Sequence, residues 1–468
     1  MKKQQQSHRD RNTLMTALMA LGISWSGVQP SWAEPGALTQ LPAPDGCIAE
    51  VGNGIDCTDG FGLAGAIDVT VSPDGKHAYV ASYESDAIVV FARNKPTGVL
   101  TQLPGLDGCI ANAGDGVTCT DGVGLDGAAA VTVSPDGKHV YVASWFGNSI
   151  TAFARNKPTG VLTQLPGLDG CIANAGDGVT CTDGVGLHAT ADVTVSPDGK
   201  HVYVASTFSN TVAVFARNQT TGVLTQLAAP DGCIAEIGDG VTCTDGIGLD
   251  GTRSVTVSKD GKHVYVASRL SDAVAIFTRN KTTGVLTQLA APDGCIAEIG
   301  DGVTCTDGIG LNGARSVTVS KDGKHVYVAS QLSDAVAIFT RTKTTGVLTQ
   351  LPAPNGCISQ TGDGVTCIDG VGLDGASSVT VSKDGKHAYV ASAFSDAVAV
   401  FARTKTTGVL TQLSNPHGCI AETGNGVTCI DGVGLDEATA VTVSPDGKHV
   451  YVASFQSDAI TVFAREQE

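Results

Sequence analysis

The sequence predicts an all-β protein, a seven-bladed β-propeller with four antiparallel strands in each blade. Three observations lead to this prediction. After its first 34 residues the chain consists of seven near-identical copies of a 62-residue unit. Each copy holds four short segments in which apolar and polar residues alternate, and turn sequences separate them. No helical pattern lies between these segments, and a propeller blade normally takes about 40 to 45 residues.

The second copy shows the four expected strands at residues 131–134, 139–144, 149–155 and 161–165. Their period of two is typical of strands that pack one face against a neighbour. The segment Ser134-Pro-Asp-Gly-Lys138 predicts a tight turn, because proline fixes φ at its second position and glycine accepts a positive φ at its fourth. A Thr-Gly turn connects the third and fourth segments in the same way.

Each copy exceeds an ordinary blade by roughly 20 residues, and this surplus contains a Cys-x9-Cys pair. We expect each pair to close a miniature hairpin with its own disulfide, although pairing between neighbouring copies stays open. Zinc is disfavoured because no histidine accompanies the pairs and the gap is wide for a chelating pair. The expected disulfides are Cys47 to Cys57, Cys109 to Cys119, Cys171 to Cys181, Cys233 to Cys243, Cys295 to Cys305, Cys357 to Cys367 and Cys419 to Cys429.

The two ends of the repeat region predict how the ring closes. The last copy stops at Arg465–Glu468, where its fourth strand should begin. The missing segment, Gly36–Leu41, stands near the N-terminus instead. We therefore expect this segment to complete the last blade, which removes an open sheet edge. Residues 34–468 would then form one domain whose blades share a continuous core.

Residues 1–33 predict an export signal. Lysines and arginines begin it, an apolar run from Leu14 to Trp25 follows, and Ser31-Trp-Ala33 resembles a cleavage site. The run is too short to span a bilayer and no later one is longer, so we expect no membrane span. Paired cysteines agree with an oxidising compartment, which predicts a periplasmic or secreted protein. The net charge of −17 argues against a nucleic-acid partner.

The segment Val-Ser-Pro-Asp-Gly-Lys-His-Val-Tyr-Val-Ala-Ser at 133–144 resembles the YVTN-type repeats of lactonase-like seven-bladed propellers. That family includes 6-phosphogluconolactonases and carboxymuconate-cyclising enzymes, and the resemblance covers 35–468 apart from the cysteine insertions. It implies the fold and, less specifically, a site of histidine, arginines and a glutamate around a central funnel. The comparable positions hold His188, Arg253, Arg269 and Arg315, whereas no matching glutamate is evident and Glu84 is the only acid at its loop position.

Seven copies provide an internal comparison, so the positions that differ are candidates for function. Differences concentrate before the first strand and after the second strand of each blade, and both places are expected on one face. Aromatic residues, arginines and acids occupy them in different blades, although drift of exposed loops is a competing interpretation. We predict a ligand-binding site made of Asp68, Glu84, Trp145, Asp192, Arg253, Arg269 and Arg315.

The leading functional prediction is an exported, non-catalytic, monomeric propeller that binds a small anionic ligand or a protein partner on this face. Its main support is that residues 93–125 and 155–187 are identical, since an active site should be asymmetric. The alternative is a lactone hydrolase or muconate-cyclase-like enzyme, in which Arg253 and Arg315 stabilise an oxyanion and His188 moves protons. An envelope structural module is a third possibility. No cofactor or metal is expected. Calcium is the alternative that the Asp-rich insertions raise, although their spacing matches no known calcium loop.

Overall fold

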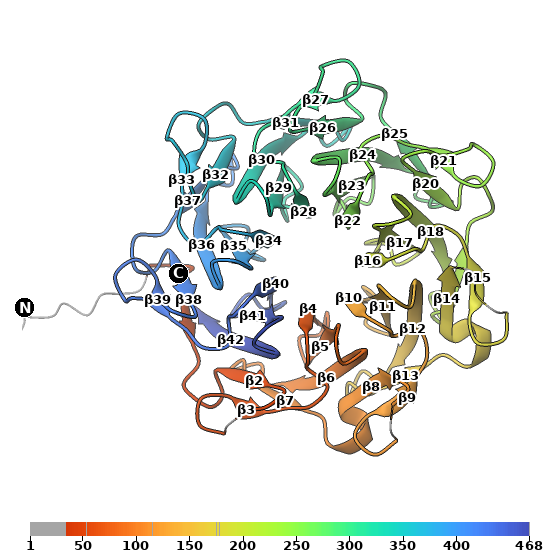
Figure 1. Cartoon of the computed structure of the whole chain (residues 1–468), viewed down its shortest axis with the longest axis horizontal. Helices are drawn as coiled ribbons and strands as arrows, with labels where there is room; N and C mark the ends of the chain where they lie inside the picture. Colours follow the sequence, from red (N-terminus) through yellow and green to blue (C-terminus); the bar gives the residue numbers. More distant parts are fainter. Residues whose placement is uncertain (1–33, 53, 115, 175, 177, 468) are drawn as a thin grey trace, which may run out of the picture. The chain divides into compact units, whose positions relative to one another are not determined.

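The computed structural model describes residues 34–52, 54–114, 116–174, 176 and 178–467, and the predicted export signal lies outside them. Residues 34–468 form one compact unit. Its seven six-stranded sheets stand around a central axis as the blades of a propeller, so the predicted fold is confirmed (Figure 1). Two short 3-10 turns, Gly105–Gly108 and Gly167–Gly170, interrupt the strands of the described residues. No helix in this part is long and apolar enough to cross a membrane.

The three inner strands of each blade repeat with little change. The innermost strands are β4 (Ala66–Val71), β10 (Ala128–Val133), β16 (Thr190–Val195), β22 (Thr252–Val257), β28 (Ala314–Val319), β34 (Ala376–Val381) and β40 (Ala438–Val443). The second strands are β5 (His77–Ser82), β11 (His139–Ser144), β17 (His201–Ser206), β23 (His263–Ser268), β29 (His325–Ser330), β35 (His387–Ser392) and β41 (His449–Ser454). The third strands are β6 (Ala87–Arg93), β12 (Ser149–Arg155), β18 (Thr211–Arg217), β24 (Ala273–Arg279), β30 (Ala335–Arg341), β36 (Ala397–Arg403) and β42 (Ala459–Arg465).

The outer part of each blade consists of three shorter strands. Those that follow the third strand are β7 (Leu100–Gln102), β13 (Leu162–Gln164), β19 (Leu224–Gln226), β25 (Leu286–Gln288), β31 (Leu348–Gln350), β37 (Leu410–Gln412) and β1 (Leu38–Gln40). Each first cysteine begins one of β8 (Cys109–Asn112), β14 (Cys171–Asn174), β20 (Cys233–Ala235), β26 (Cys295–Ala297), β32 (Cys357–Ser359), β38 (Cys419–Ala421) and β2 (Cys47–Ala49). The edge strands are β9 (Thr120–Gly122), β15 (Thr182–Gly184), β21 (Thr244–Asp245), β27 (Thr306–Asp307), β33 (Ile368–Asp369), β39 (Ile430–Asp431) and β3 (Thr58–Asp59).

The N-terminal strands complete the last blade, as the sequence predicts. β1 pairs antiparallel with β42, with Leu38 opposite Arg465 and Gln40 opposite Phe463. β2 continues along the same strand, with Cys47 opposite Thr461. The last blade therefore contains both ends of the repeat region (Figure 1).

The seven disulfides form within their own loops, which confirms the predicted pairing. The predicted hairpin is wrong, because β8 and β9 run parallel, with Ile110 opposite Thr120. Cys109 begins β8 and Cys119 immediately precedes β9, and their Cα atoms are 4.9 Å apart. The bond thus joins the starts of two parallel strands. In a hairpin it would join the start of one strand to the end of the other.

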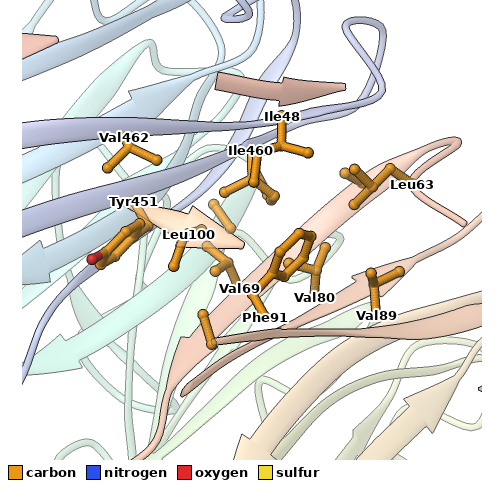
Figure 2. Close-up of a cluster of buried hydrophobic side chains, with 14 of the residues drawn as sticks. Ile48, Leu63, Val69, Val80, Val89, Phe91, Leu100, Tyr451, Ile460 and Val462 are labelled. Atoms are coloured by element: carbon orange, nitrogen blue, oxygen red, sulfur yellow. The ribbon is translucent and has the colours of Figure 1, made fainter. Parts of the chain in front are cut away.

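The hydrophobic core lies between neighbouring blades. At the junction of the last and first blades, Tyr451, Ile460 and Val462 pack against Val80 and Phe91, all with almost no exposed surface (Figure 2). Equivalent clusters fill the five junctions from the first blade to the sixth. Each blade is therefore stabilised mainly by burying apolar surface against its neighbours.

A polar cluster also joins each pair of blades, at the end of the strands where the Asp-Gly turns lie. Arg155 Nε donates to the hydroxyl of Tyr79 at 2.6 Å, and its Nη2 contacts Asp74 at 3.1 Å and His77 Nδ1 at 2.7 Å. Its Nη1 donates to the carbonyl of Gly137 in its own blade. The repeated histidines and arginines therefore connect neighbouring blades. The same arginine–aspartate pair occurs at all seven interfaces.

Candidate functional site

A cavity of about 280 Å³ lies on the axis, at the end of the strands opposite the arginine clusters. All seven blades line it, with residues from the first positions of the innermost strands and from the loops after the second strands. Differences among the seven copies concentrate in these two places. Because the strands of a propeller converge there, one variable position in each blade is enough to build an asymmetric site.

Five of the seven predicted ligand-binding residues line this cavity: Asp68, Trp145, Asp192, Arg253 and Arg315. The other two, Glu84 and Arg269, are exposed and do not line it. The charge of Arg269 still lowers the pKa values of Arg253 and Arg315. Arg269 therefore lies close enough to contribute to the positive potential of the cavity.

His188, predicted as a proton carrier, is exposed and lies outside the cavity lining. Its ring meets Phe208 edge-on, with the ring centroids 5.3 Å apart. Its backbone N–H donates to the hydroxyl of Ser209. His188 corresponds in the repeat to Asp126 of the second blade, and it lies three positions before Ala191, which lines the cavity. A catalytic role of this residue stays a prediction.

Arg253 and Arg315, on adjacent blades, are the cations of the cavity. Among the described residues neither guanidinium forms an ion pair or hydrogen bond, and Arg253 Cζ lies 5.0 Å from the ring centroid of Trp145. Burial, followed by repulsion from Arg315 and Arg269, lowers the pKa of Arg253 to about 9. Burial likewise lowers the pKa of Arg315. Two charged and partly desolvated guanidinium groups that lack carboxylate partners are suited to binding an anion.

Glu437 is a cavity residue that the sequence analysis missed. It occupies a turn position with φ of 55°, where five other blades have glycine. A non-glycine residue in this region costs about 1 kcal/mol or more, so such an outlier often has a functional reason. Its charge opposes the lowering of the pKa of Arg315. The signal was present in the sequence, since the Asp-Gly pair at 126–127 becomes Asp436-Glu437.

The aspartates of the cavity hold backbone groups of the innermost strands. Asp68 Oδ2 accepts the N–H of Val131 in the next blade at 2.8 Å. Asp192 Oδ2 accepts the N–H of Val255 at the same distance. The hydroxyls of Ser254, Ser316 and Ser378 take the corresponding N–H groups of the following blades at 3.3 to 3.4 Å.

The two remaining blades have Ala130 and Ala440 at this position, which cannot accept a hydrogen bond. In both cases the next blade has aspartate, whose other oxygen, Oδ1, accepts the N–H that the alanine leaves free. Asp192 takes that of Val193 at 2.7 Å, and Asp68 takes that of Val69 at 2.8 Å. A carboxylate has two oxygens, so each aspartate serves two blades, and all seven N–H groups have an acceptor.

Both aspartates are partly withdrawn from water. Burial raises the pKa of Asp68 to about 7, and the two N–H donors reduce this effect. Burial also raises the pKa of Asp192. The hydrogen bonds to the innermost strands thus explain why aspartate stands at these two positions. Both aspartates also line the cavity.

Three aromatic side chains line the cavity: Tyr83, Trp145 and Phe455. The ring of Tyr83 lies between Phe146, with centroids 5.2 Å apart, and Phe455, with centroids 6.1 Å apart. Trp145 meets Phe208 edge-on at 5.3 Å. Burial raises the pKa of Tyr83, so its hydroxyl is a neutral donor at physiological pH. Within the described part of the chain, no three acidic, histidine or cysteine side chains gather to hold a metal ion.

Fold and cavity together define a seven-bladed propeller with an axial, arginine-bearing pocket. The family model described as a seven-bladed β-propeller lactonase matches residues 176–295, 302–368 and 379–468, which is more than half of the chain. The chain therefore belongs to the seven-bladed β-propeller lactonase family.

Curated relatives have low identity. A 6-phosphogluconolactonase of Enterobacter sp. (strain 638) is 22% identical over 225 residues, which is 48% of this chain and 56% of the relative. A 6-phosphogluconolactonase of Klebsiella pneumoniae (strain 342) is 21% identical over 54% of this chain and 63% of the relative. The match thus spans less than two thirds of either enzyme.

Solved structures share the fold. The periplasmic gluconolactonase of Pseudomonas aeruginosa is 17% identical with a TM-score of 0.52, over 81% of this chain and 88% of that one. The hydrazine synthase of Kuenenia stuttgartiensis is 18% identical with a TM-score of 0.54, over 87% and 97%. Similarity at this level concerns the architecture, which serves different reactions.

The family membership contradicts the leading sequence-based prediction of a non-catalytic binding protein and favours its enzymatic alternative. The identity of neighbouring copies was misleading for a physical reason. The identical stretches 93–125 and 155–187 supply no residue of the cavity, whose asymmetry comes from one or two positions in each blade.

Proposed function

We propose that the protein hydrolyses a lactone that carries an anionic group, and that the reaction takes place in the axial cavity. The observation that carries the proposal is the pair of partly buried guanidinium groups, Arg253 and Arg315, without carboxylate partners in a cavity that also contains Glu437. Family membership supports the reaction class.

The arginine pair supplies the electrophilic side of the mechanism. A carbonyl oxygen directed at Arg253 and Arg315 becomes more negative as the tetrahedral intermediate forms. Fixed, partly desolvated cations stabilise that charge more strongly than water does, because they need no reorganisation. The exposed Arg269 adds to the positive potential that attracts an anionic substrate.

Glu437 supplies the general base in this proposal. Its carboxylate accepts a proton from a water molecule while the water oxygen forms a bond to the lactone carbonyl carbon. The bond between that carbon and the ring oxygen then breaks, and the protonated Glu437 returns the proton to the leaving alkoxide. The product is an open-chain hydroxy acid. Asp68 and Asp192 accept hydrogen bonds from substrate hydroxyl groups with their remaining lone pairs.

We also propose that the enzyme works in the periplasm or outside the cell. Seven disulfides fit an oxidising compartment. The predicted export signal at residues 1–33 agrees with this location.

The test is hydrolysis of a panel of lactones with and without a carboxylate or phosphate group. Arg253→Ala and Arg315→Ala should raise KM most for the anionic members, and Glu437→Gln should lower kcat with little change in KM. Lys281→Ala, an exposed charge change in the turn between the third and fourth strands, serves as the control and should leave both constants unchanged. Hydrolysis that survives Glu437→Gln and both arginine variants would refute the assignment.

A further inference from the structure

Five large apolar side chains lie in the loops after the second strands of blades two to six, the same loops that supply Tyr83, Trp145 and Phe455 to the cavity. They occupy one repeat position, immediately after the residue that follows the second strand, and we call them the collar. Each is more than half exposed: Phe146 57%, Phe208 61%, Leu270 63%, Leu332 53% and Phe394 59%.

The collar has kept its apolar character while its neighbours changed. The preceding position varies freely, with Trp145, Thr207, Arg269, Gln331 and Ala393 in the same blades. The collar position itself changes only between phenylalanine and leucine in these blades, in an exposed loop of a protein with net charge −17. Five exposed apolar side chains are thus gathered on consecutive blades, and an exposed apolar patch of this kind indicates contact with an apolar group.

The collar is continuous with the wall of the cavity. Phe208 touches Trp145, with ring centroids 5.3 Å apart, and Phe146 touches Tyr83 at 5.2 Å. Trp145 in turn lies against the guanidinium of Arg253. An apolar path therefore leads from the buried cation to the protein surface. Blades one and seven have Glu84 and Gln456 at the collar position, so the apolar arc has a polar gap.

We propose that the substrate is an amphiphilic lactone, whose polar head enters the cavity and whose hydrocarbon tail lies along Trp145 and Phe208 onto the collar. The inference rests on the proposed lactone hydrolysis and adds the chemical class of the substrate. The arginines lie inside the cavity and bind the polar head, whereas the apolar side chains outside it contact the hydrocarbon tail. Each end of the molecule thus meets a surface of matching polarity.

The test is a homologous series of lactones with tails from methyl to octyl, together with n-alkyl carboxylates of the same lengths as ligands that cannot turn over. The full chain with Trp25→Phe and Trp32→Phe retains Trp145 as its single tryptophan, so its emission reports binding at the collar. Phe208→Ser and the double change Phe146→Ser/Phe394→Ser remove parts of the collar. Val303→Ser and Ile299→Ser, 74% and 92% exposed on a disulfide loop, are matched controls.

The expected result is a KM that falls by about two- to fourfold for each added methylene, as burial of a methylene predicts, with nearly constant kcat. The carboxylates should bind with the same dependence and shift the Trp145 emission. Phe208→Ser should flatten the dependence on tail length, whereas the two control variants should retain it.

A KM and a Trp145 emission that are independent of tail length would overturn the inference, even if short lactones are hydrolysed. Collar variants that alter only the oligomeric state, measured by size-exclusion chromatography, would overturn it in favour of a second copy of the chain. Failure of the proposed function is a separate outcome. In that case no lactone is hydrolysed, while length-dependent carboxylate binding would still support an amphiphile as ligand.

Discussion

The pairing of alanine and aspartate around the axis makes a quantitative prediction for blades two and three. Asp192→Ser removes the carboxylate that serves both Val193 and Val255. The new hydroxyl can hold Val255, as Ser254 holds Val317, but Val193 loses its acceptor because Ala130 has none. An unpaired N–H costs about 1–3 kcal/mol, and access of cavity water favours the lower end. We therefore expect the free energy of unfolding to fall by about 1 kcal/mol on account of Val193.

Adding Ala130→Ser to Asp192→Ser should recover that loss, because the hydroxyl of the new serine takes the N–H of Val193 as the other blades do. Ala130→Ser alone should change stability little, since Asp192 already holds Val193. The coupling energy of the cycle is thus about 1 kcal/mol. Removal of the buried carboxylate is common to both Asp192 variants and cancels in their comparison.

The assay is urea unfolding with intact disulfides, combined with deuterium uptake of the β16 peptide, Thr190–Val195. Faster uptake in Asp192→Ser that returns to the wild-type rate in the double variant is the expected pattern. Equal stabilities of Asp192→Ser and the double variant would refute the reasoning, as would an equal gain from Ala130→Ser in both backgrounds.

Three further predictions follow from the site and the blade interfaces. Glu437→Gly restores the residue that most copies have at this position, where φ is 55°. It should raise the free energy of unfolding by about 1 kcal/mol and abolish lactone hydrolysis. A variant that loses activity and also melts at a lower temperature would contradict this. Arg155→Met leaves Asp74 and Tyr79 without their partner at a blade interface and should cost about 3 kcal/mol in urea unfolding, with Arg217→Met costing the same; unequal losses would show that the interfaces differ. The pKa of Asp68 is about 7 in the folded chain against an ordinary 3.8, so folding binds a proton and this contribution to stability falls as pH rises from about 4 to about 7. Asp68→Ser should abolish that slope, and an unchanged difference between wild type and variant across this range would disprove it.

The fold was predictable because every local signal agrees. The 62-residue period, the alternation of polarity and the displaced strand Leu38–Gln40 all indicate a closed ring, and β1 indeed pairs with β42. The direction of β9 was not predictable. A spacing of nine residues between two cysteines fixes the size of a loop, but both a hairpin and a parallel return bring Cys109 and Cys119 within bonding distance.

The candidate site was predictable in composition and less so in geometry. Comparison among copies located Asp68, Trp145, Asp192, Arg253 and Arg315, because an axial position can vary without disturbing the core. Glu437 was not predicted because it directly precedes β40, two residues before the strand-start positions where most differences among the copies lie. Two blades have aspartate in place of serine because each of these carboxylates accepts two backbone N–H groups, one in its own blade and one in the next. This depends on how adjacent blades are aligned in the folded ring, which the repeat pattern does not specify.

The pairing of β1 with β42 also determines how the molecule responds to tension. Leu38 lies opposite Arg465 in an antiparallel pair, so residues 34 and 467 leave the sheet side by side. A force applied to both ends would break the hydrogen bonds of this strand pair one after another. It would not load all of them at the same time. The ring should consequently open between β1 and β42 at low force. A force applied through residues of two opposite blades should need to be much larger to unfold the protein.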